Sequence, residues 1–115
     1  MHIFFILKQI MNVSIREQFL KDFPPKELRG IIDQGKKEIK SGIIICISTF
    51  EDKVGVAVGV SKDLTSKYDA VNLVKIASET LGGKGGGGRK DFAQAGGVDK
   101  DKVEKAFKEI SKKIN

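Results

Sequence analysis

Residues 81–97 read LGGKGGGGRKDFAQAGG, the densest concentration of glycine in the chain. Six of the chain's 13 glycines lie between Leu81 and Arg89, and two more close the stretch. Glycine loses more conformational entropy on folding than any other residue, so an ordered run of this density is costly. A folded domain retains such a run where a Cβ does not fit, or where bare backbone N–H groups must meet a ligand.

A flexible linker or an elaborate helix-to-strand turn is the alternative interpretation of this run. Two features favour an ordered structure instead. The run contains no serine and is followed at once by an apolar segment that ends in a second glycine pair. It also follows a strongly apolar helical pattern, for which Gly82 supplies a stop signal. We therefore predict an ordered, backbone-rich anion site.

The predicted site combines backbone donors with positive charge. Lys84, Arg89 and Lys90 lie within the run, and their charges suit an anionic partner such as phosphate. Gln94 could hydrogen-bond a base or sugar, or it could tie the loop to its own strand, and Lys62 could contribute from a neighbouring loop. The predicted nucleic-acid-binding residues are Lys62, Lys84, Gly85, Gly86, Gly87, Gly88, Arg89, Lys90 and Gln94.

The pattern of residues 82–97, with the helix before it, closely resembles the C-terminal (DHHA1-type) domain of alanyl-tRNA synthetases. The resemblance also covers the segment FPPKELR at 23–29, the residues from Val54 to Thr65, and the helix that begins at Asp69. It therefore extends over about residues 12–115, which we interpret as a DHHA1-type tRNA-binding domain. Residues 1–11 are interpreted as an N-terminal extension or a fragment boundary.

The resemblance implies a function for the chain. In alanyl-tRNA synthetases this domain is non-catalytic and contacts the elbow of the alanine-specific tRNA, where the D and T loops meet. It links aminoacylation with editing, and its other partners are the upstream domains of the same enzyme. The resemblance implies a cytoplasmic parent enzyme, an alanine–tRNA ligase that uses ATP, magnesium and zinc. For this chain alone we expect no cofactor, and a homodimer only through the parent chain.

Two alternative functions remain open at this point. The related domain of DHH-type phosphoesterases closes a nucleotide substrate against a metal site. Those relatives usually carry a histidine in the glycine motif, where this chain reads Gly87-Gly88-Arg89, so the synthetase is favoured. A purely structural or docking module is the other alternative, and it applies if the glycines serve only close packing.

Composition limits the remaining functional classes. A chain of 115 residues with 40% hydrophobic content is typical of a single soluble domain. The formal net charge of +6 favours a polyanionic partner, and from Lys84 onward nine cations stand against five anions. The only cysteine, Cys46, lies in an isoleucine-rich run and is predicted to be buried and inert. With His2 as the only histidine, we predict no catalytic residues and no metal site.

The N-terminal segment carries a short apolar run at residues 3–7, which Lys8 interrupts. This run lacks a basic region before it and is far too short to span a membrane. We therefore predict neither a signal peptide nor a membrane segment.

Hydrophobic periodicity predicts a single domain of the mixed α/β (α+β) class: a small mixed β-sheet with a hairpin, packed by three helices. One face of the second hairpin strand carries only Gly55, Ala57 and Gly59, so a helix is expected to pack closely against it. Arg29 and Lys36 are placed on the outer face of the first helix. Strands are expected at 12–20, 43–50, 54–60 and 91–95, and helices beginning near Asp22, at Asp69 and at Asp99 or Asp101.

Overall fold

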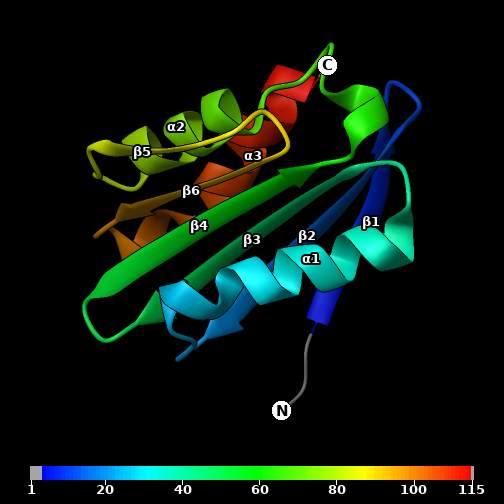
Figure 1. Cartoon of the computed structure of the whole chain (residues 1–115). Coiled ribbons are helices and arrows are strands. Elements are labelled where there is room, and N and C mark those ends of the chain that lie inside the picture. The colour runs from blue at the N-terminus through cyan, green and yellow to red at the C-terminus, as the bar shows by residue number, and fades with distance from the viewer. Residues whose placement is uncertain (1–3, 115) are drawn as a thin grey trace.

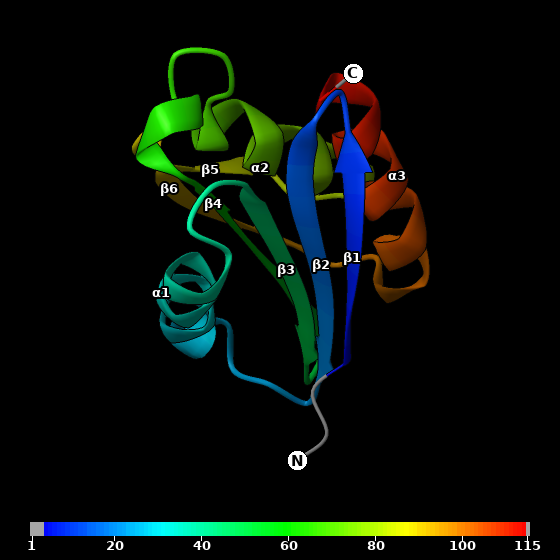
Figure 2. The ribbon, with the colours of Figure 1, turned by 90° about the vertical axis from the view of Figure 1, so that its right-hand side faces the viewer.

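The structure of the chain is a computed structural model, and it describes residues 4–114. A six-stranded β-sheet has the strand order β1-β2-β3-β4-β6-β5. Helix α1 covers one face of this sheet, and helices α2 and α3 cover the other (Figures 1 and 2). This arrangement confirms the predicted mixed α/β domain. The elements are β1 (Phe4–Ile10), β2 (Val13–Lys21), α1 (Leu28–Ile39), β3 (Ile43–Phe50), β4 (Lys53–Val60), α2 (Ala70–Thr80), β5 (Gly85–Gly88), β6 (Phe92–Gly97) and α3 (Val103–Ile114).

The sheet mixes one parallel pair with antiparallel pairs. Strands β2 and β3 are parallel and are joined by α1, which crosses over the sheet between them. Strands β3 and β4 form the predicted hairpin, in which Ile43 lies opposite Val60. Strand β3 is buried on both faces from Ile43 to Ser48, because the helices cover both sides of the sheet centre.

Glycines allow α1 to lie close to the sheet, as the sequence predicts. A Cβ added at Gly55 would lie 2.7 Å from the Cβ of Pro25, and one at Gly35 would lie 2.8 Å from the Cδ1 of Ile44. Gly59 faces Ile32 and Lys36 in the same way. The face of β4 without large side chains therefore allows α1 to pack closely. This packing fixes the position of α1 relative to the next strand, β6.

Two features of the N-terminal half differ from the sequence expectation. The first helix, expected to begin near Asp22, begins later and is not capped by Asp22: Pro24 precedes a short 3-10 turn at Pro25–Glu27 that no side chain caps, and α1 starts at Leu28. Asp22 instead takes a positive φ of 55° at the end of β2. Within the segment interpreted as an extension, Phe4–Ile10 forms strand β1 and pairs with β2; residues 1–3 lie outside the described residues.

Candidate nucleic-acid interface

The glycine run forms strand β5 at one edge of the sheet, where the sequence predicts a loop. A tight turn joins it to β6: Arg89 N–H donates to the Phe92 oxygen at 2.7 Å, and Phe92 N–H donates to the Arg89 oxygen at 3.3 Å. Bonded and non-bonded pairs alternate along an antiparallel ladder. Gly87 therefore bonds to its partner Gln94, and the N–H groups of Gly86 and Gly88 point outward from the sheet edge.

Ser78 of α2 anchors the other end of β5. Its Oγ accepts a hydrogen bond from Gly85 N–H at 2.9 Å and donates to the Gly96 oxygen at 2.6 Å. Of the four glycine N–H groups that the sequence places in the site, those of Gly85 and Gly87 thus bond within the protein. Those of Gly86 and Gly88 face away from β6.

The glycines of β5 divide into two kinds. A Cβ at Gly86 would overlap the Gln94 oxygen and lie 2.6 Å from the Ala95 Cα, and one at Gly88 would overlap the Phe92 oxygen. These two glycines are needed so that β5 can approach β6. A Cβ at Gly87, in contrast, would have no heavy atom within 4 Å. Its absence leaves bare backbone exposed on the surface.

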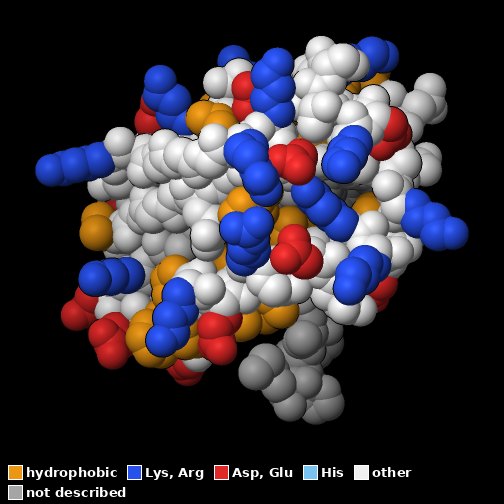
Figure 3. All heavy atoms as spheres, in the orientation of Figure 1, with side chains coloured by type: hydrophobic (Ala, Val, Ile, Leu, Met, Phe, Trp, Pro, Cys, Tyr) orange, Lys and Arg blue, Asp and Glu red, His pale blue; other side chains and the backbone are white. Residues whose placement is uncertain are grey.

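This bare surface lies on the α1 side of the sheet. Gly87 is opposite Gln94, whose Nε2 donates to the Pro25 oxygen at 3.1 Å on that side. Helix α1 packs on β3 and β4, so it leaves β5 uncovered there. Figure 3 shows the region as an area of backbone and uncharged atoms with Lys and Arg side chains around it. We call this surface, formed by Gly85, Gly87, Gln94 and Gly96, the glycine face.

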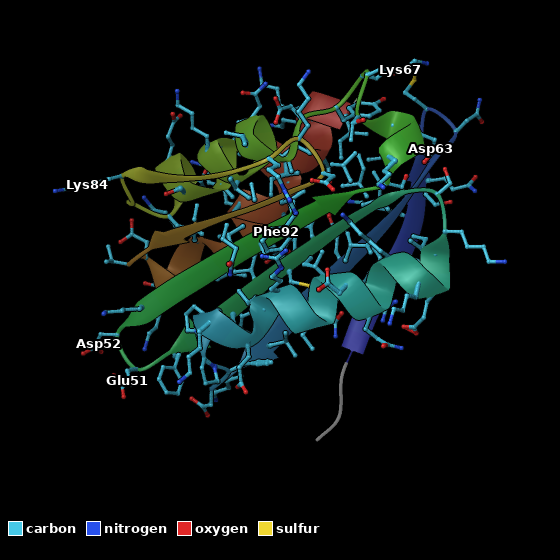
Figure 4. The ribbon with its side chains drawn as sticks, viewed as in Figure 1. Glu51, Asp52, Asp63, Lys67, Lys84 and Phe92 are labelled. Atoms are coloured by element: carbon cyan, nitrogen blue, oxygen red, sulfur yellow. The ribbon has the colours of Figure 1, made fainter. Side chains whose placement is uncertain are left out.

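The predicted cations lie at the two ends of the glycine face. Lys84 precedes β5, whereas Arg89 and Lys90 follow it, so a strand of about 16 Å separates the two groups. Lys62 belongs to the Arg89 end, because Val60 N–H donates to the Asp91 oxygen at 2.9 Å and Lys62 comes two residues later. Figure 4 shows Lys84 far from Asp63, the residue that follows Lys62. All four cations are exposed.

Two cations of α1 border the same surface and are not among the predicted site residues. The Lys36 Nζ donates to the Asp91 backbone oxygen at 2.6 Å and lies 4.0 Å from its Oδ2. The Arg29 guanidinium lies 5.0 Å from the centre of the Phe92 ring. Helical periodicity places both residues on the solvated face of α1. The face of β4 that carries only small side chains could have revealed the position of these two cations. A helix packed on that face has its outer side chains beside β6.

Tyr68 and Cys46 pack in the hydrophobic core and not on the glycine face. Tyr68 donates its hydroxyl to the Ile114 oxygen at 3.1 Å and packs at the edge of the core. Cys46 is fully buried, and burial raises the pKa of its thiol to about 12.

Among residues 4–114 no group of three or more His, Cys, Asp or Glu side chains could hold a metal ion. In the same range, no helix is long and apolar enough to cross a membrane.

A family model described as the DHHA1 domain matches residues 11–115. The chain belongs to the DHHA1 domain family. It is homologous to the C-terminal domain of alanyl-tRNA synthetases, in agreement with the resemblance seen in its sequence. The crystal structure of the C-Ala domain from Aquifex aeolicus alanyl-tRNA synthetase has a TM-score of 0.87 and 29% identity, and the match covers 94% of this chain and 96% of that one.

Curated relatives of this DHHA1 domain are much longer proteins. It is 51% identical over 101 residues to an alanine–tRNA ligase of Hyphomonas neptunium, and 44% identical over 107 residues to one of Bradyrhizobium diazoefficiens. These matches cover 88% and 92% of the chain but only 12% of each relative. A DHH domain described as a member of the s1p family of ribosomal proteins shares the fold, with a TM-score of 0.60 and 20% identity over 98% of this chain and 28% of that one.

Proposed function

We propose that this DHHA1 domain is the non-catalytic, tRNA-binding C-terminal domain of an alanine–tRNA ligase. In this proposal the glycine face and its flanking cations contact the elbow of the alanine-specific tRNA. The domain links aminoacylation with editing in a cytoplasmic parent enzyme, whose upstream domains are its second partner. The ATP, magnesium and zinc of the parent enzyme belong to those upstream domains.

The observation that carries the proposal is the exposed, side-chain-free backbone of β5 between two groups of cations. A Cβ at Gly87 would meet no atom within 4 Å, so close packing does not explain a glycine there. Bare backbone allows a ribose-phosphate chain to approach closely, and the outward N–H groups of Gly86 and Gly88 can donate to phosphate oxygens. Lys84 and Arg89 supply charge at the two ends.

The same surface favours recognition of shape over recognition of bases. Sequence-specific RNA binding uses exposed aromatic side chains on which bases stack. Phe92 is buried beneath Arg29, and the Tyr68 hydroxyl is bonded to the Ile114 oxygen. Contacts to phosphate and sugar therefore supply most of the affinity that we expect.

Two alternatives are less well supported. The likeness to the DHH domain at 20% identity supports a common fold and nothing about nucleotide hydrolysis. A docking module accounts for Gly86 and Gly88, which pack against β6, and the positive φ of 96° accounts for Gly85, but the open position of Gly87 is left unexplained.

The decisive experiment measures binding of the purified chain to alanine tRNA over a salt series, with a mononucleotide and duplex DNA as comparison ligands. A linear fall of log affinity with log salt is expected, and the slope reports the number of phosphate contacts. The triple variant Lys84→Ala, Arg89→Ala, Lys90→Ala should bind more weakly. Its slope should be smaller by about 0.7–0.9 for each phosphate that the removed cations neutralise in the original chain.

The matched control removes three positive charges elsewhere. Lys105, Lys108 and Lys113 are exposed on α3, on the opposite side of the sheet from the glycine face. Their replacement by Ala should leave most of the binding intact. Equal losses of affinity for the two triple variants would mean that only net charge matters, and the glycine face would then be rejected as the RNA-binding surface.

A further inference from the structure

The carboxylate of Asp91 lies between two cations that belong to different elements. Its Oδ1 is 3.5 Å from the Nε of Arg89, and its Oδ2 is 4.0 Å from the Nζ of Lys36 on α1. The side chains of Asp91 and Lys36 are 28% and 26% exposed, whereas that of Arg89 is 69% exposed. The carboxylate is therefore partly sheltered, and it connects a surface arginine to a helix that packs on the sheet.

The backbone of Asp91 is held by three parts of the fold. Its oxygen accepts hydrogen bonds from the N–H of Val60 at 2.9 Å and from the Nζ of Lys36 at 2.6 Å. Arg89 and Phe92 exchange two backbone hydrogen bonds on either side of it, which close the turn between β5 and β6. Asp91 is thus fixed to the end of β4, to α1 and to the turn, and its carboxylate is a fixed partner for the longer side chain of Arg89.

Arg89 lies at the end of the glycine face. It follows Gly87 by two residues, and side chains two positions apart in an extended chain share a face. Its contact with Asp91, which also contacts Lys36 of α1, agrees with this placement. A guanidinium group carries five N–H donors. The contact through Nε leaves the donors of the two terminal nitrogens for a phosphate.

We propose, on the basis of the function proposed above, that Asp91 is a positioning residue that makes Arg89 selective for folded tRNA. An exposed arginine without a partner samples many rotamers and can pair with any phosphate nearby. The carboxylate of Asp91 confines Arg89, so that its terminal nitrogens lie at a set distance from the outward N–H of Gly88. Donors with a set spacing fit a phosphate chain of one geometry better than they fit other polyanions.

The negative charge of Asp91 acts in the opposite direction. A carboxylate repels phosphate, so its removal should strengthen binding to every RNA, with or without an elbow. The ammonium group of Lys36 offsets part of this repulsion. The affinity for one RNA therefore combines the effect of charge with the effect of positioning. The ratio of the affinities for two RNAs of equal charge isolates positioning.

The test compares binding of alanine tRNA with binding of a duplex RNA that has the same number of nucleotides and no elbow. We call the ratio of the two affinities the tRNA preference. Asp91→Ala should lower the tRNA preference by about threefold or more, because Arg89 is then free to follow other phosphates. The backbone oxygen of Asp91 is retained in this variant, so its bonds from Val60 and Lys36 persist, and the circular dichroism spectrum should be unchanged.

The matched control removes a carboxylate that has no contact with Arg89. Asp33 is exposed on α1, between Arg29 and Lys36 in the sequence, and Asp33→Ala changes the net charge by the same amount. This variant should bind both RNAs slightly more tightly and keep the tRNA preference of the original chain. Asp91→Asn removes the charge and keeps the size of the side chain. It should lower the tRNA preference in the same direction as Asp91→Ala, even if alanine disturbs the turn.

A double variant shows whether Asp91 acts through Arg89. In a chain that already carries Arg89→Ala, the further change Asp91→Ala should leave the tRNA preference unchanged, because no guanidinium group remains to be positioned. A merely structural role of Asp91 would lower the preference in both chains.

The outcomes distinguish this proposal from the function on which it rests. An original chain without a tRNA preference would overturn both. A preference that survives Asp91→Ala and Asp91→Asn, that falls equally with Asp33→Ala, or that falls further in the double variant would overturn the role of Asp91 alone.

Discussion

Lys36 and Asp91 are 55 positions apart in the sequence, and the Nζ of Lys36 donates a hydrogen bond of 2.6 Å to the backbone oxygen of Asp91. Asp91 lies in the turn between β5 and β6, and its Oδ1 is 3.5 Å from the Nε of Arg89. Helix α1 is thereby linked to the turn that carries two of the proposed RNA-binding cations. Arg89 is therefore connected both to its own strand and, through Asp91, to α1.

Lys36→Met should lower the free energy of unfolding by about 1–2 kcal/mol, because it removes a partly buried hydrogen bond from a charged donor. The loosened turn should also exchange the amide hydrogen of Arg89 faster. Chemical denaturation and hydrogen exchange measure the two effects. Lys37→Met is the control, since Lys37 is exposed on the same helix, and it should change stability by less than about 0.5 kcal/mol. Equal effects of the two variants would show that the contact with Asp91 is not stabilising.

Gly86→Ala and Gly87→Ala should have opposite effects although the residues are neighbours. A Cβ at Gly86 would overlap the Gln94 oxygen, so we expect a loss of more than about 2 kcal/mol or displacement of β5. A Cβ at Gly87 meets open space, and alanine restricts the unfolded chain, so stability should be unchanged or rise by about 0.5 kcal/mol. Thermal denaturation distinguishes the two; a flexible run would tolerate both substitutions equally.

Gly87→Glu should weaken tRNA binding without unfolding the domain. The side chain has room at this position, and its negative charge would lie in the middle of the glycine face. Gly87→Gln has nearly the same size and no charge, so it separates repulsion of phosphate from simple obstruction. We expect the glutamate variant to bind at least fivefold more weakly than the glutamine variant at low salt. Equal affinities of the two variants would place the RNA elsewhere.

Stability should fall in alkaline solution partly because of Cys46. Burial raises the pKa of its thiol from 9.0 to about 12, so between these values the unfolded chain releases a proton that the folded chain keeps. The contribution of this pKa difference to the free energy of unfolding is fully present below pH 9. It is lost as the pH rises toward 12, by about 1.4 kcal/mol for each pH unit. Cys46→Val should remove that part of the decline. An equal fall in the free energy of unfolding with pH for the two proteins above pH 9 would contradict the assignment of this decline to Cys46.

The regular elements could be predicted from their patterns of apolar and small residues. Ile43 to Phe50 begins with a continuous apolar run, which matches a strand covered on both faces, and Gly55, Ala57 and Gly59 recur with a period of two, which matches a strand face closely packed by a helix. Strand β5 could not be predicted, since glycine has low strand propensity and its repetition hides the period of two. The contact of Lys36 with Asp91 could not be predicted either, because it depends on where α1 crosses the sheet.

The glycines of β5 have no side chains by which one position could be told from the next, so its alignment with β6 rests on the two ends. Ser78 holds one end and the tight turn between Arg89 and Phe92 holds the other. The number of glycines between these two ends therefore sets the distance between them. One glycine more or fewer would turn the Arg89 side chain to the opposite face of the sheet relative to Gly85. Two more would return it to its present face and increase its distance from Gly85 by about 7 Å. In this strand the number of residues carries the information that side chains carry elsewhere.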